Sequence, residues 1–237
     1  MRNSTISRQP LGCTGRRRIE AAVCALLLAF SGTLPAETTT NAPKIRQISP
    51  GVFQIGKVRL DRSARSVTFP AVVNMTDSIV EYVVVTGQGK LHESLLRSDA
   101  VPRDIHVAML LIDAKGSGTN VVPPDPLKSI PGDPVSIEVS WTEKGKTKRV
   151  PVEKLIFNTQ TKANLTPGPW IYNGSLIDNG VFMADPEGSI VSLITDPFAL
   201  VNNPRPGRDN DDLCEVDSKS VPPLDTPVEV RITLQKK

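Results

Sequence analysis

A strand-like run, a glycine turn and an apolar helix follow one another between Glu81 and Gly116, and this stretch constrains the fold more than any other. Residues 81–86 are mostly β-branched or aromatic, which is typical of a strand in a pleated sheet. Gly87 and Gly89 then interrupt the run and accept the positive φ that a hairpin turn requires. We therefore predict that residues 91–96 form the return strand of a hairpin.

Both histidines of the chain lie in this stretch, at His92 and His106. If residues 91–96 form a strand, alternation places His92 and Ser94 on one face and Glu93 on the other. A site that uses both His92 and Glu93 would then need a bulge or a twist in the strand.

The second half of the stretch has the pattern of a buried helix. Pro102 fixes φ for a helix start, and Asp104 lies in the first turn, where the helix dipole favours an acid. Apolar residues at helical spacing are Ile105, Ala108, Met109 and Ile112. We predict one main helix over about residues 103–114, packed on the sheet. His106 and Asp113 would share its remaining sector, about 10 Å apart along the axis.

Several sequence blocks in this order resemble one bacterial family. The strings GKLHES and DIHVAMLL come first, and GPWIYNGS, VFMADPEGSIVSLI and SVPPLDTPVEVRITL follow. Together they are similar to the YdjY-like domain family of exported bacterial proteins, over roughly residues 50 to 237. The positions that match the family pattern are His92, Glu93, Ser94 and His106. The resemblance implies a fold and an exported location, but no reaction.

The first residues have the features of a targeting segment. Three arginines at 16–18 precede the apolar run AAVCALLLAF and the small-residue exit SGTLPA, which together indicate a secretory signal peptide cut after Ala36. A membrane anchor is the alternative, but the apolar run is short for a bilayer. We expect a signal peptide over 1–36, a flexible linker over 37–50 and a single domain over 51–237. The mature protein would be periplasmic or extracellular, with no integral membrane segment.

Removal of this leader changes the charge of the chain. Residues 1–36 hold five arginines and one glutamate, so the formal net charge of +3 becomes about −1. The remainder does not gather basic and aromatic residues into one stretch, and we therefore do not expect a nucleic-acid partner. Cys214 is the one cysteine left after cleavage, so an internal disulfide is impossible and the core must hold the fold.

The remaining patterns predict a β-rich α+β domain with antiparallel or mixed sheets. The predicted strands include residues 58–60, 66–73, 135–141, 148–152, 170–172, 181–184, 189–195 and 227–234. A turn at Asn179–Gly180 joins two of them. Helical turns are predicted over 152–157 and 196–200, and the proline-rich segment 121–134 is predicted to be a loop.

Two histidines and nearby carboxylates suggest a divalent metal site. His92 and His106 with Glu93, Asp113 or Asp104 would supply imidazole and carboxylate ligands. The alternative is structural: His106 packs in the helix and His92 forms a hydrogen bond within the sheet. The spacing matches no established zinc motif.

The other chemical patterns are weaker. Ser94 with His92 or His106 could form a hydrolytic pair, but no G-x-S-x-G elbow surrounds the serine. The acidic loop with Asp209, Asp211 and Asp212 does not match an EF-hand. We therefore expect a non-catalytic module that binds an unknown protein or small molecule. The alternative is a metal-dependent hydrolase that uses His92 and His106. The ligand-binding candidates are His92, Glu93, Ser94, His106 and Asp113.

Overall fold

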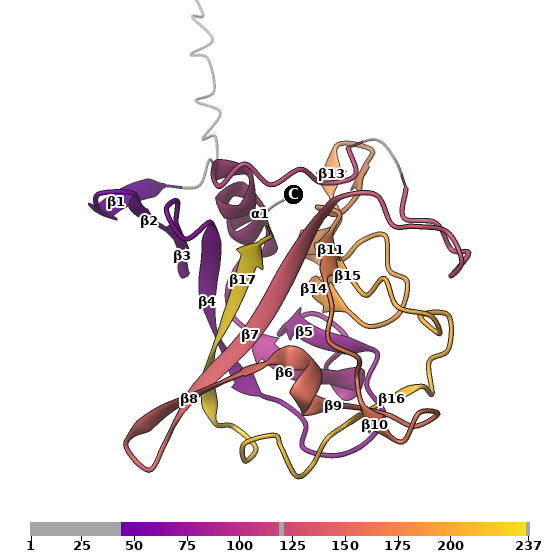
Figure 1. Cartoon of the computed structure of the whole chain (residues 1–237). Coiled ribbons are helices and arrows are strands. Elements are labelled where there is room, and N and C mark those ends of the chain that lie inside the picture. The colour runs from indigo at the N-terminus through magenta and orange to yellow at the C-terminus, as the bar shows by residue number, and fades with distance from the viewer. Residues whose placement is uncertain (1–43, 119–120, 236–237) are drawn as a thin grey trace, which may run out of the picture. The chain divides into compact units, whose positions relative to one another are not determined.

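Eight strands close into a mixed β-barrel in the computed structural model, which describes residues 44–118 and 121–235 (Figure 1). In spatial order the strands are β4 (Ser66–Val73), β17 (Pro227–Leu234), β7 (Asp133–Glu143), β11 (Trp170–Tyr172), β15 (Val201–Asn202), β14 (Ser189–Ser192), β5 (Tyr82–Thr86) and β6 (Ser94–Ser98). The pairing of β4 with β6 closes the ring. The β5–β6 and β14–β15 pairs are parallel, so the barrel is mixed.

Further strands extend or flank this barrel. The sheet continues outward from β4 through β3 (Val58–Asp61), β2 (Val52–Ile55) and β1 (Ile45–Ser49), and β8 (Lys146–Pro151) pairs with β7. Two small sheets contain β9 (Ile156–Asn158), β10 (Ala163–Asn164) and β16 (Cys214–Val216), and β12 (Ile177–Asp178) with β13 (Val181–Phe182). The helices are α1 (Pro102–Leu111), the short α2 (Ala184–Glu187) and the 3₁₀ turns η1 (Leu91–Glu93) and η2 (Val152–Leu155). The predicted β-rich fold with mixed sheets is confirmed.

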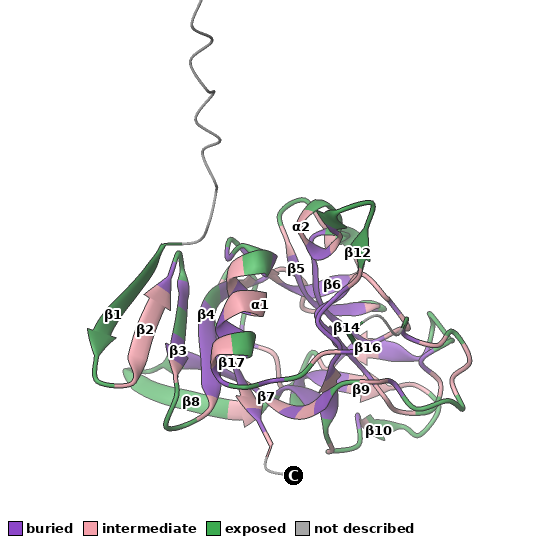
Figure 2. Cartoon of the chain, turned by 90° about the horizontal axis from the view of Figure 1, so that it is seen from above, coloured by how far each residue is buried: buried purple, intermediate pink, exposed green. Residues whose placement is uncertain are grey.

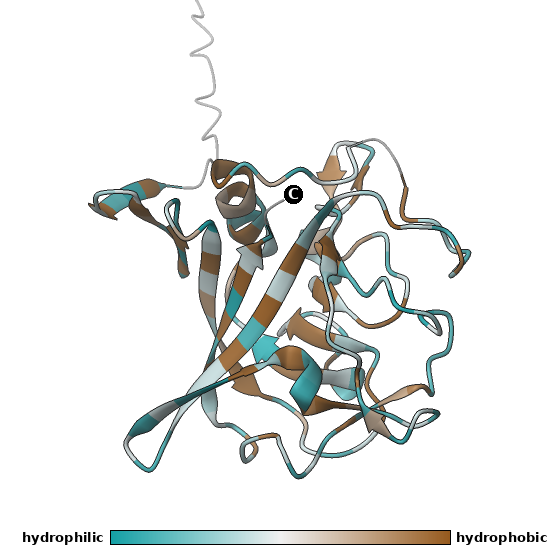
Figure 3. Ribbon diagram, in the orientation of Figure 1, coloured by the Kyte–Doolittle hydropathy of each residue, from teal (hydrophilic) through white to brown (hydrophobic). Residues whose placement is uncertain are grey.

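The core follows the alternation of the long strands. On β17 the buried residues Val228, Val230 and Ile232 alternate with more exposed neighbours. In Figure 3, brown bands alternate with pale or teal bands along β7 and β17. Complete burial of one such side chain contributes about 1.5–3 kcal/mol. The strand faces that the sequence pattern assigns to the core are therefore those that fill the barrel.

Helix α1 packs against β3 and β4, and Figure 2 shows it beside β4. Its Ile105, Ala108 and Met109 are buried, which confirms the predicted helix on the sheet. The helix ends earlier than expected, because Ile112 is the C-cap and Asp113 has a φ of 66°. The predicted shared helix face of His106 and Asp113 was therefore wrong.

Asp113 occupies the left-handed position that glycine favours after a helix. The amide of Ala114 donates to the carbonyl of Met109 across this residue. Asp113→Gly should stabilise the domain by about 1 kcal/mol, since it removes a strained φ and a negative charge from a helix C-terminus. Thermal unfolding measures the gain, and Asp113→Asn separates the charge from the backbone effect. A glycine variant that melts no higher than the parent would contradict this account.

The predicted hairpin after β5 was wrong. Residues 91–93 form η1 rather than a strand, and β6 then runs parallel to β5 with Tyr82 opposite Ser94. The glycine turn does reverse the chain, but η1 brings it back to the start of β5 before β6 begins. His92 is therefore not on a strand, and the predicted alternation of His92, Glu93 and Ser94 does not apply.

Other local predictions differ from the structure at single elements. The linker expected over 37–50 was wrong at residues 45–49, because Ile45–Ser49 forms β1. All five residues are exposed, so no buried alternation marks the strand. Residues 196–200 form turns rather than a helix, whereas η2 confirms the helical turn after Pro151. The Asn179–Gly180 turn joins β12 and β13. It does not join residues 170–172 to residues 181–184 as predicted, because β11 pairs with β7 and β15. The predicted signal peptide and residues 37–43 lie outside the described residues.

Candidate functional site

The loop between β5 and β6 is held in place by side chains beneath it. Asn74 donates from Nδ2 to the carbonyl oxygens of Leu91 and Ser94, at 2.7 and 2.8 Å. The buried Ser94 hydroxyl donates to the carbonyl oxygen of Lys90 at 2.6 Å. Three short hydrogen bonds thus fix both ends of η1. They also give the Ser94 hydroxyl a backbone partner.

A lysine–tyrosine pair lies directly under η1. Lys90 Nζ is 3.1 Å from Tyr82 Oη and 5.0 Å from the centre of the Tyr82 ring. Burial, and then the nearby Asp196 carboxylate, raises the pKa of Tyr82 to about 12. Burial by itself would lower the pKa of Lys90, but its contacts with Tyr82 and Glu93 outweigh burial and raise it to about 12. Both groups therefore keep their protons at neutral pH.

Glu93 joins this pair to His92. Glu93 lies 3.6 Å from Lys90 Nζ and 3.4 Å from His92 Nε2. The His92 side chain is 80% exposed, whereas that of Glu93 is 18% exposed. The site therefore presents one exposed imidazole on a carboxylate that is itself anchored to a lysine.

Glu81 adds a crowded carboxylate to this cluster. Burial, followed by the charges of Glu93 and Asp211, raises the pKa of Glu81. A carboxyl whose pKa is raised on folding contributes stability below its unfolded pKa and loses it as the pH rises through the folded pKa. At neutral pH the ionised Glu81 is thus unfavourable in the folded state.

Glu81→Gln should therefore raise the melting temperature at about pH 7, and the gain should vanish at about pH 3, where both forms are neutral. Melting curves of the two proteins across this range measure the difference. A variant that is less stable at pH 7, or equally stabilised at both pH values, would show that Glu81 is not strained by its neighbours.

His106 lies in a different environment, against β11 and β13. Its Nδ1 is 2.8 Å from Tyr172 Oη, and its ring centre is 4.8 Å from that of Phe182. Burial lowers the pKa of His106, although the charge of Asp185 opposes this shift. The imidazole is therefore neutral at neutral pH and packs between two aromatic rings.

Asp185 links the two helices beside this histidine. One of its carboxylate oxygens accepts from the Arg103 amide at 3.0 Å, and the other lies 2.8 Å from the Arg103 guanidinium. A pocket of about 430 Å³ opens next to this pair, between the ends of β5 and β6 and the start of α1. Thr86, Ser98 and Asp185 contribute polar groups to its lining, and Ala100, Val101 and Pro102 contribute apolar ones.

The predicted site residues fall into separate places. His92, Glu93 and Ser94 lie together at the start of β6, whereas His106 lies on α1 and Asp113 is exposed beyond it. Strand β6 runs between η1 and α1, and five residues of strand span about 13 Å. Within residues 44–118 and 121–235, no group of three or more His, Cys, Asp or Glu side chains is arranged to hold a metal ion. The divalent metal site stays a prediction.

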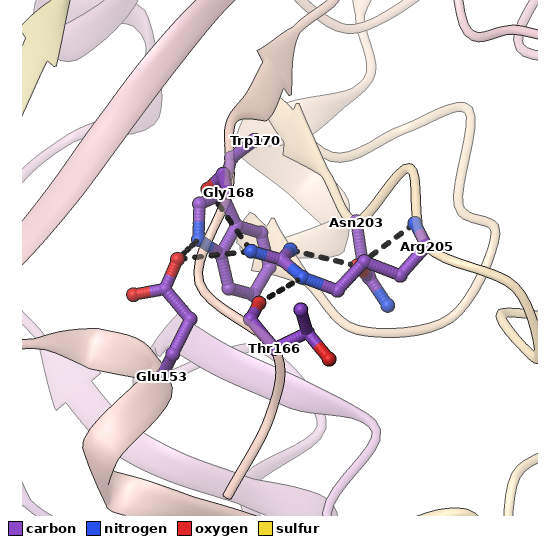
Figure 4. Close-up of polar contacts among 6 residues, drawn as sticks. All are labelled: Glu153, Thr166, Gly168, Trp170, Asn203 and Arg205. Atoms are coloured by element: carbon purple, nitrogen blue, oxygen red, sulfur yellow. Dashed lines mark hydrogen bonds and ion pairs between the residues drawn. The ribbon is translucent and has the colours of Figure 1, made fainter.

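The sequence pattern did not single out the buried charged network in Figure 4. Glu153 Oε1 accepts from Trp170 Nε1 at 3.0 Å and from Arg205 Nη2 at 2.9 Å. Arg205 also donates to the carbonyl oxygens of Thr166 and Gly168, and it lies over the Trp170 ring. Glu153 and Arg205 are 52 residues apart, so no local spacing could reveal the pair. Because its donors are used within the fold, the network has a structural role.

Cys214 lies close to this network and is buried. Burial raises the pKa of its thiol to about 11, although Arg205 opposes the shift. The thiol is therefore protonated at neutral pH, which does not favour a nucleophilic role.

The sequence matches one protein-family model. The model of the YdjY domain matches residues 58–233, which is most of the chain and includes residues of every barrel strand. The chain belongs to the YdjY domain family. No curated protein and no solved structure matches it. In the described part of this YdjY domain protein, no helix is both long and apolar enough to cross a membrane.

Proposed function

We propose that this YdjY domain protein is an exported, non-catalytic binding module of the bacterial envelope. Its recognition surface would be η1, with His92 as the exposed contact and with Glu93 and Lys90 behind it. The partner would be a protein or small molecule that offers an oxygen or nitrogen atom to the imidazole.

The observation that carries this proposal is the exposure of His92 on a fixed turn. Asn74 and Ser94 hold the backbone of η1, and Lys90 is held by Tyr82, yet the His92 side chain is 80% exposed. A rigid loop that presents a polar ring loses little conformational entropy when it binds. Glu93 beside the ring orients it and can accept a proton-bearing group of the partner.

The protonation of the groups beneath η1 supports binding rather than catalysis. A general base or acid works best with a pKa near the operating pH. Tyr82 and Lys90 have pKa values of about 12, far from neutrality. Ser94 donates to the backbone and is fully buried. These groups therefore suit a supporting framework. Export is supported by the basic, apolar and small-residue segments that precede Glu37.

Photocrosslinking in an exporting bacterium tests the proposal. A photoreactive amino acid replaces the exposed Gln88, in the loop that leads to η1, in one strain, so that His92 stays in place. In a control strain it replaces the exposed Ile177, on the β12–β13 hairpin. We expect a discrete adduct from position 88 alone, in the periplasmic fraction, on a chain that begins at Glu37. Excess purified domain should compete it away, whereas excess His92→Ala domain should not. Equal adducts at both positions, or equal competition by both domains, would contradict the proposal.

A further inference from the structure

Arginines that are far apart in the sequence form a row across the extended sheet. Arg46 on β1 lies opposite Gln54 on β2, which lies opposite Arg59 on β3. Arg59 lies opposite Thr68 on β4, and Thr68 lies opposite Arg231 on β17. We call Arg46, Arg59 and Arg231 the arginine row. Each arginine is two strands from the next, which is about 10 Å.

The arginine row faces away from the core. Along each strand the neighbours of these residues point inward: Leu60 beside Arg59, Val67 beside Thr68 and Ile232 beside Arg231 are buried in the core. Since successive side chains point to opposite faces, the row lies on the outer face. Arg46 and Arg59 are exposed and Arg231 is partly exposed. Thr68 is only 6% exposed although it points outward, because it lies between two arginines.

The guanidinium groups of the row form no ion pairs with the described residues. Among residues 44–118 and 121–235, no carboxylate lies within ion-pair distance of Arg46, Arg59 or Arg231. Glu138 is the cross-strand neighbour of Arg231, yet the two form no ion pair. Arg231 Nε is buried and has no hydrogen-bond partner in the described structure. A buried donor without a partner is unfavourable, so an acceptor supplied from outside would be favoured.

Further charged residues surround the row. Arg149 on β8 lies on the same outer face, opposite Ser140, and Arg62 and Arg65 lie at the β3–β4 turn. The residues between the arginines are Gln54 and Thr68, which leave the face free of bulky groups. Three acids share this face: Glu138 opposite Arg231, Glu229 two residues from Arg231 on β17, and Asp61 two residues from Arg59 on β3. The charge of Arg59 contributes to the lowered pKa of Asp61. The row itself carries three positive charges in a line.

We propose that the arginine row binds a linear polymer of oxyanions, phosphate or carboxylate, that crosses the strands at right angles. The planar guanidinium fork matches both oxyanions and forms paired, charge-assisted hydrogen bonds with them. An extended polymer along the row meets one guanidinium about every 10 Å. The row offers no aromatic side chain for base stacking, which favours an envelope polyanion over a nucleic acid.

This surface is independent of η1, because its residues lie on β1, β3 and β17 and its ligand contacts would not involve His92. A failure of the crosslinking experiment at position 88 therefore leaves the polyanion proposal intact, and the reverse also holds.

The test measures binding of polyphosphate and of polygalacturonate to the protein purified from an exporting host, at about 50 mM and about 200 mM salt. Arg46→Gln/Arg59→Gln removes two charges from the row. Lys144→Gln/Lys146→Gln removes two charges from the exposed β7–β8 turn and is the matched control. All four side chains are exposed, so neither variant should unfold.

We expect the row variant to lose at least about tenfold in affinity, the control variant less than about twofold, and the row variant to show a shallower salt dependence. Tighter binding of polyphosphate would identify a phosphate polymer as the source, and tighter binding of polygalacturonate a carboxylate polymer. Equal loss in both variants, binding of neither polymer at about 50 mM salt, or equally tight binding of single-stranded DNA would overturn the proposal.

Discussion

Glu153→Ala will destabilise the domain by about 3–5 kcal/mol, because it leaves the charge of Arg205 buried without its partner. The side chains of Glu153 and Arg205 are only 7% and 12% exposed. The substitution also removes the acceptor of Trp170 Nε1. Burial already lowers the pKa of Arg205 and the charge of Glu153 opposes that shift, so the carboxylate is what makes the buried cation tolerable.

Denaturant unfolding of the parent and of Glu153→Ala measures this cost. Glu143→Ala is the matched control, because Glu143 forms a more distant ion pair with Lys148 and both side chains are about half exposed. The control should cost less than about 1 kcal/mol. A Glu153→Met/Arg205→Met double variant should recover part of the loss, since no charge then remains unpaired. A loss below about 1 kcal/mol for Glu153→Ala would show that water or another group compensates Arg205.

Gly188→Ala should be the second severe change, with an expected loss of about 3 kcal/mol. Gly188 ends α2 with a φ of 68°. A Cβ at this position would meet the Thr86 hydroxyl and would lie 2.7 Å from the amide nitrogen of Gly89. Part of this contact is backbone, so it cannot be relieved by a rotamer change. The loop that leads to η1 must therefore move.

Gly51→Ala separates the two causes of this loss. Gly51 has a similar φ of 74°, but a Cβ there meets nothing within 4 Å. It should therefore cost only about 1 kcal/mol, which is the conformational part. Equal losses at positions 51 and 188 would mean that the close approach of Gly188 and Gly89 does not constrain the loop. A larger loss of stability at position 188 would show that the close approach of Gly188 and Gly89 constrains the loop that leads to η1.

Periodic patterns predicted the parts of the fold that local burial determines. The apolar spacing of α1 and the alternation of β7 and β17 appear directly in the sequence, because one face of each element fills the core. The ends of elements were less predictable. Asp113 adopts a left-handed conformation that its residue type tolerates but does not require, so the end of α1 was missed.

Long-range contacts decided what the sequence did not reveal. Gly87 and Gly89 favour a hairpin locally. Asn74, however, donates hydrogen bonds to the carbonyl oxygens of Leu91 and Ser94 and so fixes η1 at the start of β6, and β5 and β6 are parallel. A parallel pair of strands joined by so short a segment is unusual. No residue in the segment between β5 and β6 predicts the parallel pairing. His92 and His106 are neighbours in the sequence pattern, yet β6 lies between them.

Two groups of charged side chains that depend on strand pairing or long-range contacts could not be predicted from the sequence. The arginine row draws on β1, β3 and β17, and the network of Glu153 and Arg205 joins residues 52 positions apart. Register is set by pairing partners rather than by composition, so neither grouping follows from charge along the chain. By contrast, the GKLHES string does mark the loop that carries the exposed His92.

A nuclear magnetic resonance titration of the isotopically labelled domain with a soluble envelope extract tests the central claim most directly. The account predicts shifts in the amides of residues 89–93 and in the His92 ring, with the His106 ring unchanged and with the response lost in His92→Ala. Shifts centred on His106 and Asp185, or a response that His92→Ala retains, would show that η1 is not the recognition surface.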